Sequence, residues 1–312
     1  MRILDAQATR AGLPFDSLIP ALRAMFARGC TVPQRHVHQV SAPGGGFTSL
    51  LMPAWVDGCC YGVKTVNVAP HNAARGLPGL HGTYLLYDAA TGAPLALLDG
   101  DQITARRTAA ASALAASWLA RADAQHLLLV GAGQVARLLP AAYRVVRPIT
   151  RVTVWARQPA AAQALAVQLQ TDGFDAAATT DLPAAVAAAD VVSCATLATA
   201  PLVHGAWLRP GSHLDLIGSF TPAMREADDA CFAGAALYVD TDEALAKSGD
   251  LLGPMQRGVI TPADVRGTLA ALARGEAAGS SDAAQRTVFK SVGNALEDLA
   301  AAMLVCGIAL PP

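Results

Sequence analysis

The chain has 312 residues, which is enough for two domains, each with its own core. Its formal net charge of −1 and its lack of basic runs argue against nucleic acid or an anionic membrane surface as a partner and favour a small molecule. The apolar runs are shorter than a membrane span, and Met1–Asp5 shows no signal-peptide pattern. We therefore expect a cytoplasmic protein.

The cysteines and histidines do not predict a metal site. The six cysteines have no Cys-x-x-Cys spacing, and Cys59 and Cys60, if both lie on a strand, point to opposite faces of it, so we interpret all six as buried thiols. His36 and His38 share one face of a predicted strand, but no third ligand accompanies them. We expect no bound metal.

The predicted elements change character near residue 120. A short strand comes first, and Asp16 or Ser17 is a plausible cap for an apolar helix over 18–26. Strands at 34–40, 47–52, 60–68, 83–87 and 94–98 then predict a mostly antiparallel sheet, with a hairpin loop at 88–92. An alanine-rich helix over 102–120 follows.

In the second half, strands and helices alternate, as a parallel sheet requires. The predicted strands are 126–130, 151–155, 190–194, 213–217 and 236–240. Thr261 and Pro262 predict the start of another helix, and residues 287–299 run into an apolar C-terminal helix.

Residues 126–136 read as a buried strand, a glycine turn and the opening of a helix. Gly131 permits a tight turn, Gly133 lets a pyrophosphate approach the backbone, and Ala136 lets the helix pack closely on its strand. The helix N-terminus presents free N–H groups and partial positive charge. With a second strand about twenty residues on, this pattern favours dinucleotide binding over a plain strand-turn-helix.

The second strand of this unit bears on cofactor choice. NAD sites place Asp or Glu at its end, whereas here it runs into Trp155-Ala156-Arg157-Gln158. Arg157 could meet a 2′-phosphate, so we expect NADP(H) rather than NAD(H); the alternative is a solvated Arg157.

Lys64 is a charged residue within the apolar strand 60–68. An isolated buried ammonium is costly, so we expect an anionic partner for it, in a structural or a functional role. Arg106 and Arg107 lie on the predicted helix 102–120 and project about 100° apart, so at most one can face a given site and the other is expected in solvent.

Six motifs occur in order along nearly the whole chain. They are Pro33-x-Arg35, Gly62-Val63-Lys64, Thr91-Gly92-x-Pro94-Leu95-Ala96, Arg107-Thr108-Ala109-Ala110, Gly131-Ala132-Gly133 and Phe289-Lys290-Ser291-Val292-Gly293. This order resembles the ornithine cyclodeaminase/mu-crystallin family. The family includes cyclodeaminases, alanine dehydrogenases, cyclic ketimine reductases and a lens protein that binds thyroid hormone. Membership therefore predicts the fold much better than it predicts the reaction.

The resemblance implies an α/β protein with two domains. Residues 1–115, completed by 288–312, would form an α+β substrate-binding and dimerisation domain with a mostly antiparallel sheet. Residues 116–287 would form a Rossmann-type domain with a doubly wound parallel sheet. Strands within 34–68 also carry apolar side chains at more positions than one covered face explains, which favours a homodimer.

The resemblance also assigns site residues. Arg35, Lys64 and Arg107 would surround the substrate carboxylate, with Lys64 as the catalytic candidate and Thr83 nearby. The cofactor-binding candidates are Gly131, Ala132, Gly133, Gln134, Val135, Arg157, Thr196, Ser219 and Ser291.

One departure from the family separates two activities. Cyclodeaminases carry an Asp in a Gly-x-Asp-x-Pro loop, whereas residues 218–222 place Phe220 there, and an acid that those enzymes carry before Met-Pro is missing from 49–53. Phe220 would offer an apolar wall to a closed ring; Glu226 or Asp228 could instead supply a lyase acid.

We therefore expect NADPH-dependent reduction of a cyclic imino acid, pyrroline-2-carboxylate to L-proline and/or piperideine-2-carboxylate to L-pipecolate. The alternatives are an NAD-dependent ornithine cyclodeaminase, an alanine dehydrogenase and a non-catalytic NADPH-dependent ligand-binding protein.

Overall fold

The computed structural model describes residues 1–43, 45–280 and 282–311, which fold into two compact units. The first unit contains Met1–Arg107 and Asn294–Pro312, and the second contains Thr108–Gly293. The division falls inside helix α3 (Gly100–Leu119), and the expected domain bounds 1–115 with 288–312, and 116–287, stay a prediction. Within the described residues, no helix is both long and apolar enough to cross a bilayer.

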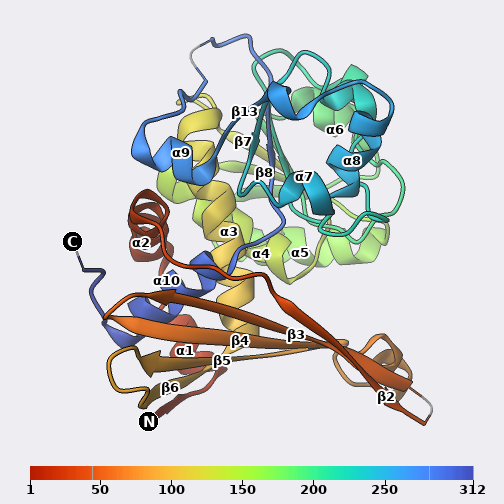
Figure 1. Cartoon of the computed structure of the whole chain (residues 1–312). Helices are drawn as coiled ribbons and strands as arrows, with labels where there is room; N and C mark the ends of the chain where they lie inside the picture. The colour runs from red at the N-terminus through yellow and green to blue at the C-terminus, as the bar shows by residue number, and fades with distance from the viewer. Residues whose placement is uncertain (44, 281, 312) are drawn as a thin grey trace. The chain divides into compact units, whose positions relative to one another are not determined.

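The first unit is built on a six-stranded sheet in the order β1-β6-β5-β4-β3-β2 (Figure 1). β1 pairs with β6 in parallel and the other neighbours are antiparallel, which confirms the mostly antiparallel sheet. The strands are β1 (Arg2–Leu4), β2 (His36–Ala42), β3 (Gly45–Val56), β4 (Cys60–Val68), β5 (Leu80–Asp88) and β6 (Pro94–Asp99).

The predicted hairpin joins β5 to β6. The side-chain Oδ1 of Asp88 accepts hydrogen bonds from the backbone N–H groups of Ala90 (3.0 Å) and Thr91 (2.8 Å). Gly92 follows with φ of 71°, a left-handed conformation that favours glycine. The loop thus closes on local hydrogen bonds, as its sequence predicts.

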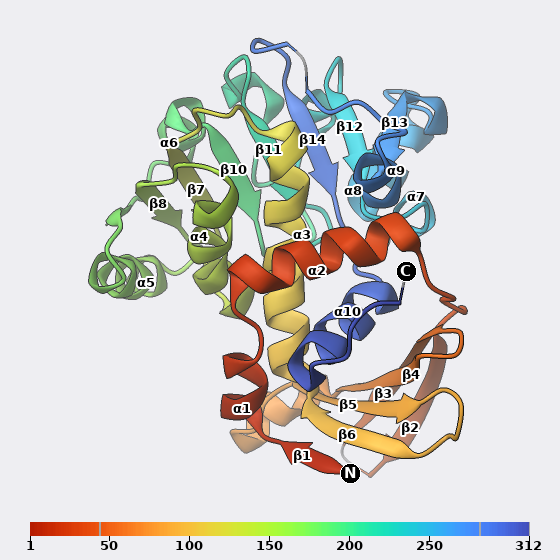
Figure 2. The same cartoon turned by 90° about the vertical axis from the view of Figure 1, so that its left-hand side faces the viewer.

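Helix α10 (Ala295–Cys306) contacts β3, β4 and helix α2 (Phe15–Arg28) (Figure 2). β4 alternates accordingly, with Gly62 and Lys64 buried and Val63 half-buried. α2 starts after Pro14 with no side-chain cap, so the expected cap at Asp16 or Ser17 is wrong: both lie inside the first turn. The unit also contains α1 (Ala6–Ala11) and a 3-10 segment, η1 (Pro70–Arg75).

The cysteine expectation is wrong in part. Cys59 lies in the turn before β4 rather than on the strand. The two thiols therefore do not point to opposite faces: the Sγ atoms of Cys59 and Cys60 are 3.8 Å apart. Cys30, Cys59 and Cys306 are partly exposed, and the other three are buried.

The second unit is built on an eight-stranded sheet in the order β13-β12-β14-β11-β10-β7-β8-β9. Every neighbouring pair is parallel, which confirms the Rossmann-type sheet. The strands are β7 (His126–Val130), β8 (Arg151–Trp155), β9 (Asp175–Ala178), β10 (Val191–Cys194), β11 (His213–Leu216), β12 (Ala236–Val239), β13 (Val265–Thr268) and β14 (Thr287–Lys290).

The helices of this unit connect the strands (Figures 1 and 2). They are α4 (Gln134–Val146), α5 (Pro159–Thr171), α6 (Leu182–Ala188), α7 (Ala244–Lys247), α8 (Gly249–Gln256) and α9 (Leu269–Arg274), with short 3-10 turns η2 (Gly205–Trp207), η3 (Asp229–Cys231) and η4 (Pro262–Asp264). The helix expected after Thr261 is only η4: the capping box of Thr261 with Asp264 is present, but the chain leaves the turn directly into β13.

The order of the sheet creates a switch point between β7 and β10. From β7 the chain builds β8 and β9 outward on one side, then crosses to β10 and β11 on the other. Open parallel sheets bind ligands at such a point, outside the carboxyl ends of the strands. This edge therefore positions the residues described next.

Candidate functional site

The glycine turn lies at the carboxyl end of β7. Gly131 has φ of 117°, and a Cβ there would lie 2.7 Å from the carbonyl oxygen of Ala195 and 3.3 Å from Cγ2 of Thr196. Only glycine fits this close approach to the segment after β10. The predicted succession of a buried strand, a glycine turn and a helix over residues 126–136 is confirmed.

Gly133 leaves the start of α4 open. It is the exposed N-cap of the helix and forms no side-chain cap, and a Cβ there would meet none of the described atoms within 4 Å. Ala132, Gln134 and Val135 complete the turn and the first helical residues. This exposed backbone at a helix N-terminus fits the diphosphate of a dinucleotide.

Arg157 lies in the bend between β8 and α5 and is exposed. Residues 155–158, at the carboxyl end of β8, contain no carboxylate.

Glu226 connects the segments that follow β10 and β11. Its Oε1 accepts hydrogen bonds from the backbone N–H of Thr196 (2.7 Å) and from the Thr196 hydroxyl (2.8 Å), and its Oε2 accepts from the backbone N–H of Gly218 (2.6 Å). Glu226 is fully buried, and burial raises its pKa to about 7. Of the two acids considered for a lyase, Glu226 thus binds loop backbone, and Asp228 accepts from the N–H of Gly205 (2.9 Å).

The remaining cofactor candidates follow β11 and β14. Ser219 is fully buried, and its hydroxyl donates to the carbonyl of Met224 (2.6 Å), so its side chain faces its own loop. Phe220 is 48% exposed. Ser291 is buried directly after β14, and its N–H donates to the carbonyl of Leu216 (3.1 Å).

In the first unit, Lys64 and Arg107 meet at one carboxylate. Lys64 Nζ lies 2.7 Å from Asp298 Oδ2 and donates to the Thr104 hydroxyl at 3.2 Å. Arg107 Nε lies 3.0 Å from Asp298 Oδ1, and its Nη1 lies 2.7 Å from Glu297 Oε2. All four charged residues are buried. The anionic partner expected for Lys64 is therefore present.

Burial and pairing oppose each other in this cluster. Burial lowers the pKa of Lys64 to about 8, although the Asp298 carboxylate acts to raise it. Burial acts to raise the pKa of Asp298, but Lys64 and Arg107 outweigh it and hold that pKa below its usual value. The cluster thus keeps a carboxylate ionised beside an ammonium that can lose its proton near neutral pH.

Gly62, two residues before Lys64, is required by the same packing. A Cβ on Gly62 would lie 2.1 Å from the buried hydroxyl of Tyr84, which is on the neighbouring strand opposite Lys64. The Gly-Val-Lys motif therefore combines a close approach of β4 to Tyr84 with the placement of Lys64.

The other two substrate candidates are Thr83, on β5, and Arg35, next to β2 of the same sheet. Thr83 is exposed and pairs with Thr65, so it lies on the opposite face of the sheet from Lys64. Arg35 is half-buried and directly precedes β2, whose register continued by one residue puts it opposite Met52, the partner of Lys64 on β3. The roles of Arg35 and Thr83 stay predictions.

The expectation that the other arginine is solvated is wrong. Arg106 is half-buried; its Nε donates to the carbonyl of Leu13 (2.7 Å), and its guanidinium lies 4.3 Å from the centre of the Phe15 ring. Its guanidinium therefore packs on the first residue of α2 instead of projecting into water.

Sequence reasoning missed Glu297 and Asp298. The signal was available: two adjacent carboxylates stand in an otherwise apolar C-terminal helix, and they are the counterpart of a lone lysine in an apolar strand. Each anomaly accounts for the other.

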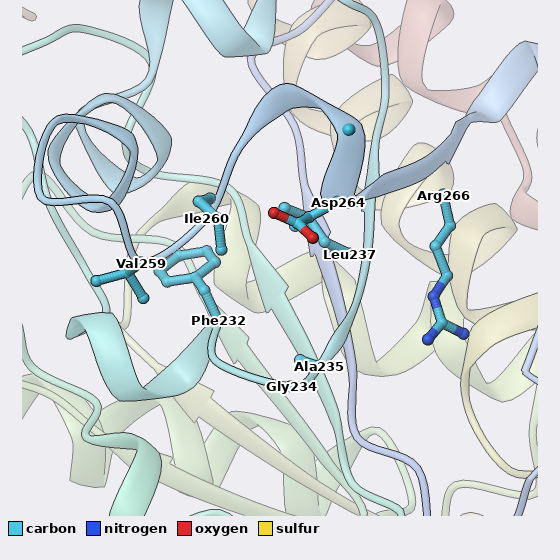
Figure 3. Close-up of a pocket in the computed structure, with 9 residues that line it drawn as sticks. Phe232, Gly234, Ala235, Leu237, Val259, Ile260, Asp264 and Arg266 are labelled. Carbon is cyan, nitrogen blue, oxygen red and sulfur yellow. The ribbon is translucent and has the colours of Figure 1, made fainter.

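A cavity of about 310 Å³ lies elsewhere in the second unit (Figure 3). It is lined by Phe232, Gly234, Ala235, Leu237, Val259, Ile260, Ala263, Asp264 and Arg266. Ala235 precedes β12 and Asp264 precedes β13, so the cavity is at the amino ends of these strands. It is therefore distinct from the carboxyl edge, where such sheets bind nucleotides.

Comparison with known proteins agrees with this architecture. A Delta(1)-pyrroline-2-carboxylate reductase from Paracoccus denitrificans is 45% identical over 95% of this chain and 93% of its own length. The structure of the Thermococcus litoralis Delta(1)-pyrroline-2-carboxylate reductase in complex with NADH and L-proline has a TM-score of 0.92 and 33% identity, covering 98% of this chain and 97% of that one. An archaeal alanine dehydrogenase dimer with bound NAD has a TM-score of 0.89 and 27% identity, covering 98% and 95%. The model of the ornithine cyclodeaminase/mu-crystallin family matches residues 15–310, and the chain belongs to this family.

Proposed function

We propose that the protein is an oxidoreductase that uses a nicotinamide dinucleotide to reduce the C=N bond of a cyclic imino acid, pyrroline-2-carboxylate or piperideine-2-carboxylate, to L-proline or L-pipecolate. The observation that carries the proposal is the buried cluster in which Lys64 and Arg107 share Asp298. Two relatives of high similarity named as pyrroline-2-carboxylate reductases support it.

The cofactor would bind at the carboxyl edge of the parallel sheet. The turn Gly131-Ala132-Gly133, with Gln134 and Val135, would hold its diphosphate, and backbone near Thr196, Ser219 and Ser291 would face the nicotinamide half. When bound, the nicotinamide supplies the hydride. We propose NADP(H) as the preferred form because Arg157, and no carboxylate, follows β8. The two solved relatives described above contain NADH and NAD, so the proposed preference rests on residues 155–158 of this chain alone.

The substrate carboxylate would bind Arg35, Lys64 and Arg107, with Thr83 as a further predicted contact. A guanidinium grips a carboxylate through two parallel N–H bonds, and an ammonium adds a point charge. Glu297 and Asp298 hold the two buried cations in place. A protonated imine is the better hydride acceptor, and Lys64, with its pKa lowered to about 8, is the group we assign to keep it protonated.

Phe220 separates this reaction from cyclodeamination. Conversion of ornithine to proline needs a carboxylate beside amines that change charge, and an aromatic ring cannot accept a proton. Glu226 and Asp228 bind backbone N–H groups of their own unit, which supports a structural role for both. We therefore infer that ornithine is not the substrate.

The proposal is tested by cofactor oxidation with a panel of substrates. Purified protein given pyrroline-2-carboxylate or piperideine-2-carboxylate should oxidise NADPH and form L-proline or L-pipecolate, respectively. Ornithine with NAD should give no proline or ammonia, and pyruvate with ammonia should give little turnover. Proline and ammonia from ornithine, with no NADPH loss on either ketimine, would identify a cyclodeaminase; tight NADPH binding with no turnover on any arm would identify a binding protein.

A further inference from the structure

Two loops at the carboxyl edge of the parallel sheet are tied by one carboxylate. Thr196 follows β10 by two residues and Gly218 follows β11 by two residues, and both donate backbone N–H groups to Glu226. The Thr196 hydroxyl adds a third hydrogen bond. Glu226 itself comes from a later segment, so it acts across the loops rather than within one of them.

The backbone that carries Glu226 is itself fixed. Oδ1 of Asp250, on α8, accepts from the N–H groups of Glu226 (2.9 Å) and Ala227 (3.1 Å). Lys290, the last residue of β14, donates to the carbonyl of Leu216 (2.9 Å), and its Nζ lies 3.8 Å from Asp250 Oδ2. The carboxylate thus has a rigid support of buried polar groups.

The packing around the carboxylate leaves little room for another arrangement. A Cβ on Gly218 would lie 2.4 Å from Glu226 Oε1 and 2.0 Å from the carbonyl oxygen of Thr196. On its other side, Thr196 lies against the glycine turn, since its Cγ2 would be 3.3 Å from a Cβ on Gly131. A continuous series of contacts therefore runs from Glu226 through Thr196 to the turn that we assign to the diphosphate.

We propose that Glu226 is a positioning residue for the cofactor: its carboxylate holds the loops after β10 and β11 in the arrangement that binds the nicotinamide dinucleotide beside the glycine turn. This inference rests on the proposed function, because it takes these loops as part of the cofactor site. Glu226 does not touch the reacting atoms; it acts through Thr196 and Gly218.

Replacement of Glu226 by glutamine tests the charge and the acceptor geometry together. The amide keeps the size of the side chain but offers one acceptor oxygen and one NH₂ donor, so an N–H of Thr196 or of Gly218 then faces a donor. A buried donor without an acceptor is unfavourable. The loops should relax, and cofactor affinity should fall.

The measurement is a fluorescence titration of NADPH and of NADH into the full-length protein. Glu226→Gln should raise the dissociation constants of NADPH and of NADH by about tenfold or more. Asp215→Asn is the matched control, because Asp215 on β11 is also fully buried but accepts from the hydroxyls of Ser193 on β10 (2.5 Å), Ser112 (3.1 Å) and Tyr143 (3.0 Å) instead of from these loops. The control should bind both cofactors as the wild type does.

The pH profile distinguishes positioning from a general loss of structure. Burial raises the pKa of Glu226 to about 7, so wild-type affinity should decline as the pH falls below 7, and Glu226→Gln should lose this dependence. The charged or titratable groups around Glu226 are Asp250 on α8, Lys290 on β14 and Cys194 on β10. All of them remain in the variant, so the difference between the two profiles belongs to Glu226. The NADH arm excludes titration of the 2′-phosphate as the cause.

The titrations distinguish a failure of the proposed function from a failure of the positioning role of Glu226. If the wild type binds neither dinucleotide, the proposed function is wrong; if it binds and Glu226→Gln has the same affinity and pH profile, the positioning role is wrong. If Glu226→Gln does not fold, Thr196→Val replaces it: this change removes the hydroxyl that donates to Oε1 and that accepts from the N–H of Ala198 (3.2 Å), while the backbone N–H of Thr196 still donates to Oε1. Weaker binding in Thr196→Val then supports the tie, and unchanged binding overturns it.

Discussion

Lys64 and Asp298 show how a buried charge can be held ready for use. The ammonium is stripped of water, which favours its neutral form, while a carboxylate 2.7 Å away favours its charged form. The two effects leave the pKa of Lys64 at about 8. A group in this range is protonated at neutral pH and can still release its proton, which suits general acid catalysis.

Lys64→Met should lower turnover on the cyclic imine by about 10²–10⁴-fold with NADPH affinity retained.

Asp298→Asn should act differently: it removes the carboxylate that raises the pKa of Lys64, so the pKa of Lys64 falls further. If protonated Lys64 is the active form, the alkaline decline of kcat/KM should move from near pH 8 to lower pH. Circular dichroism checks the fold of both variants. Wild-type turnover in Lys64→Met would remove Lys64 from the mechanism.

At this scale, sequence predicted that Lys64 needs an anion but not which one. Asp298 lies at the other end of the chain, on a helix that returns to β4; the two carboxylates stand out in that apolar helix, but chain order does not say that they meet Lys64. Gly131 was easier to interpret, because the tight turn predicted for it is found with φ of 117° and a close approach to Ala195; Gly62 was known only as part of a motif, and its contact with Tyr84 comes from the structure. Ser219 shows the limit, since a hydroxyl can turn into its own loop without any change in sequence pattern.

At the scale of elements, most strands were predicted from local patterns, and the missed ones are short strands that contain polar residues or mostly alanine. β7, with five buried residues of which four are apolar, before a glycine turn, was recognised. β14 was taken as the approach to a helix, although Thr287–Lys290 form a strand between β11 and β12. Length alone does not explain this, because β10, β11 and β12 are also four residues long and were predicted; β14 carries a polar residue at each end and is followed within a few residues by the apolar helix α10. β9, an Asp followed by three alanines, and β13, Val-Arg-Gly-Thr, were missed because neither has an apolar strand-like pattern.

The end of β8 makes a prediction about cofactor choice. Arg157→Asp should lower the ratio of kcat/KM for NADPH to that for NADH by about tenfold or more, because the cation for a 2′-phosphate is replaced by a repelling carboxylate. Arg151→Asp is the control, since Arg151 is exposed at the amino end of the same strand. Steady-state kinetics with both cofactors measure the ratio. An unchanged ratio in Arg157→Asp would refute the NADP(H) assignment.

At the scale of the whole molecule, the sheet of the first unit has apolar side chains on both faces. On the face opposite Lys64, Tyr61, Val63, Leu85, Tyr87 and Leu97 are all half-buried. The Tyr61 and Tyr87 rings lie 5.7 Å apart between centres, and Leu85 pairs with both Val63 and Leu97, so these side chains are neighbours on one face of the sheet. We propose that a second copy of the chain covers this face, which would make the protein a homodimer.

Light scattering at micromolar concentration should give twice the mass of the chain. Leu85→Asp should shift it to the monomer mass, because a carboxylate would be buried without a partner at the interface. Val145→Asp, on the exposed surface of α4, should leave the dimer intact. A wild-type mass equal to one chain would contradict the homodimer.

The central claim is reduction of a cyclic C=N bond by hydride from the cofactor, and isotope transfer tests it most directly. Protein given pyrroline-2-carboxylate and NADPH deuterated at the transferring position of the nicotinamide should yield L-proline with one deuterium atom at Cα, in step with cofactor oxidation. Mass spectrometry of the product measures this. Two results would contradict the claim. One is proline without deuterium from pyrroline-2-carboxylate. The other is no proline from pyrroline-2-carboxylate, together with proline and ammonia from ornithine in a separate reaction.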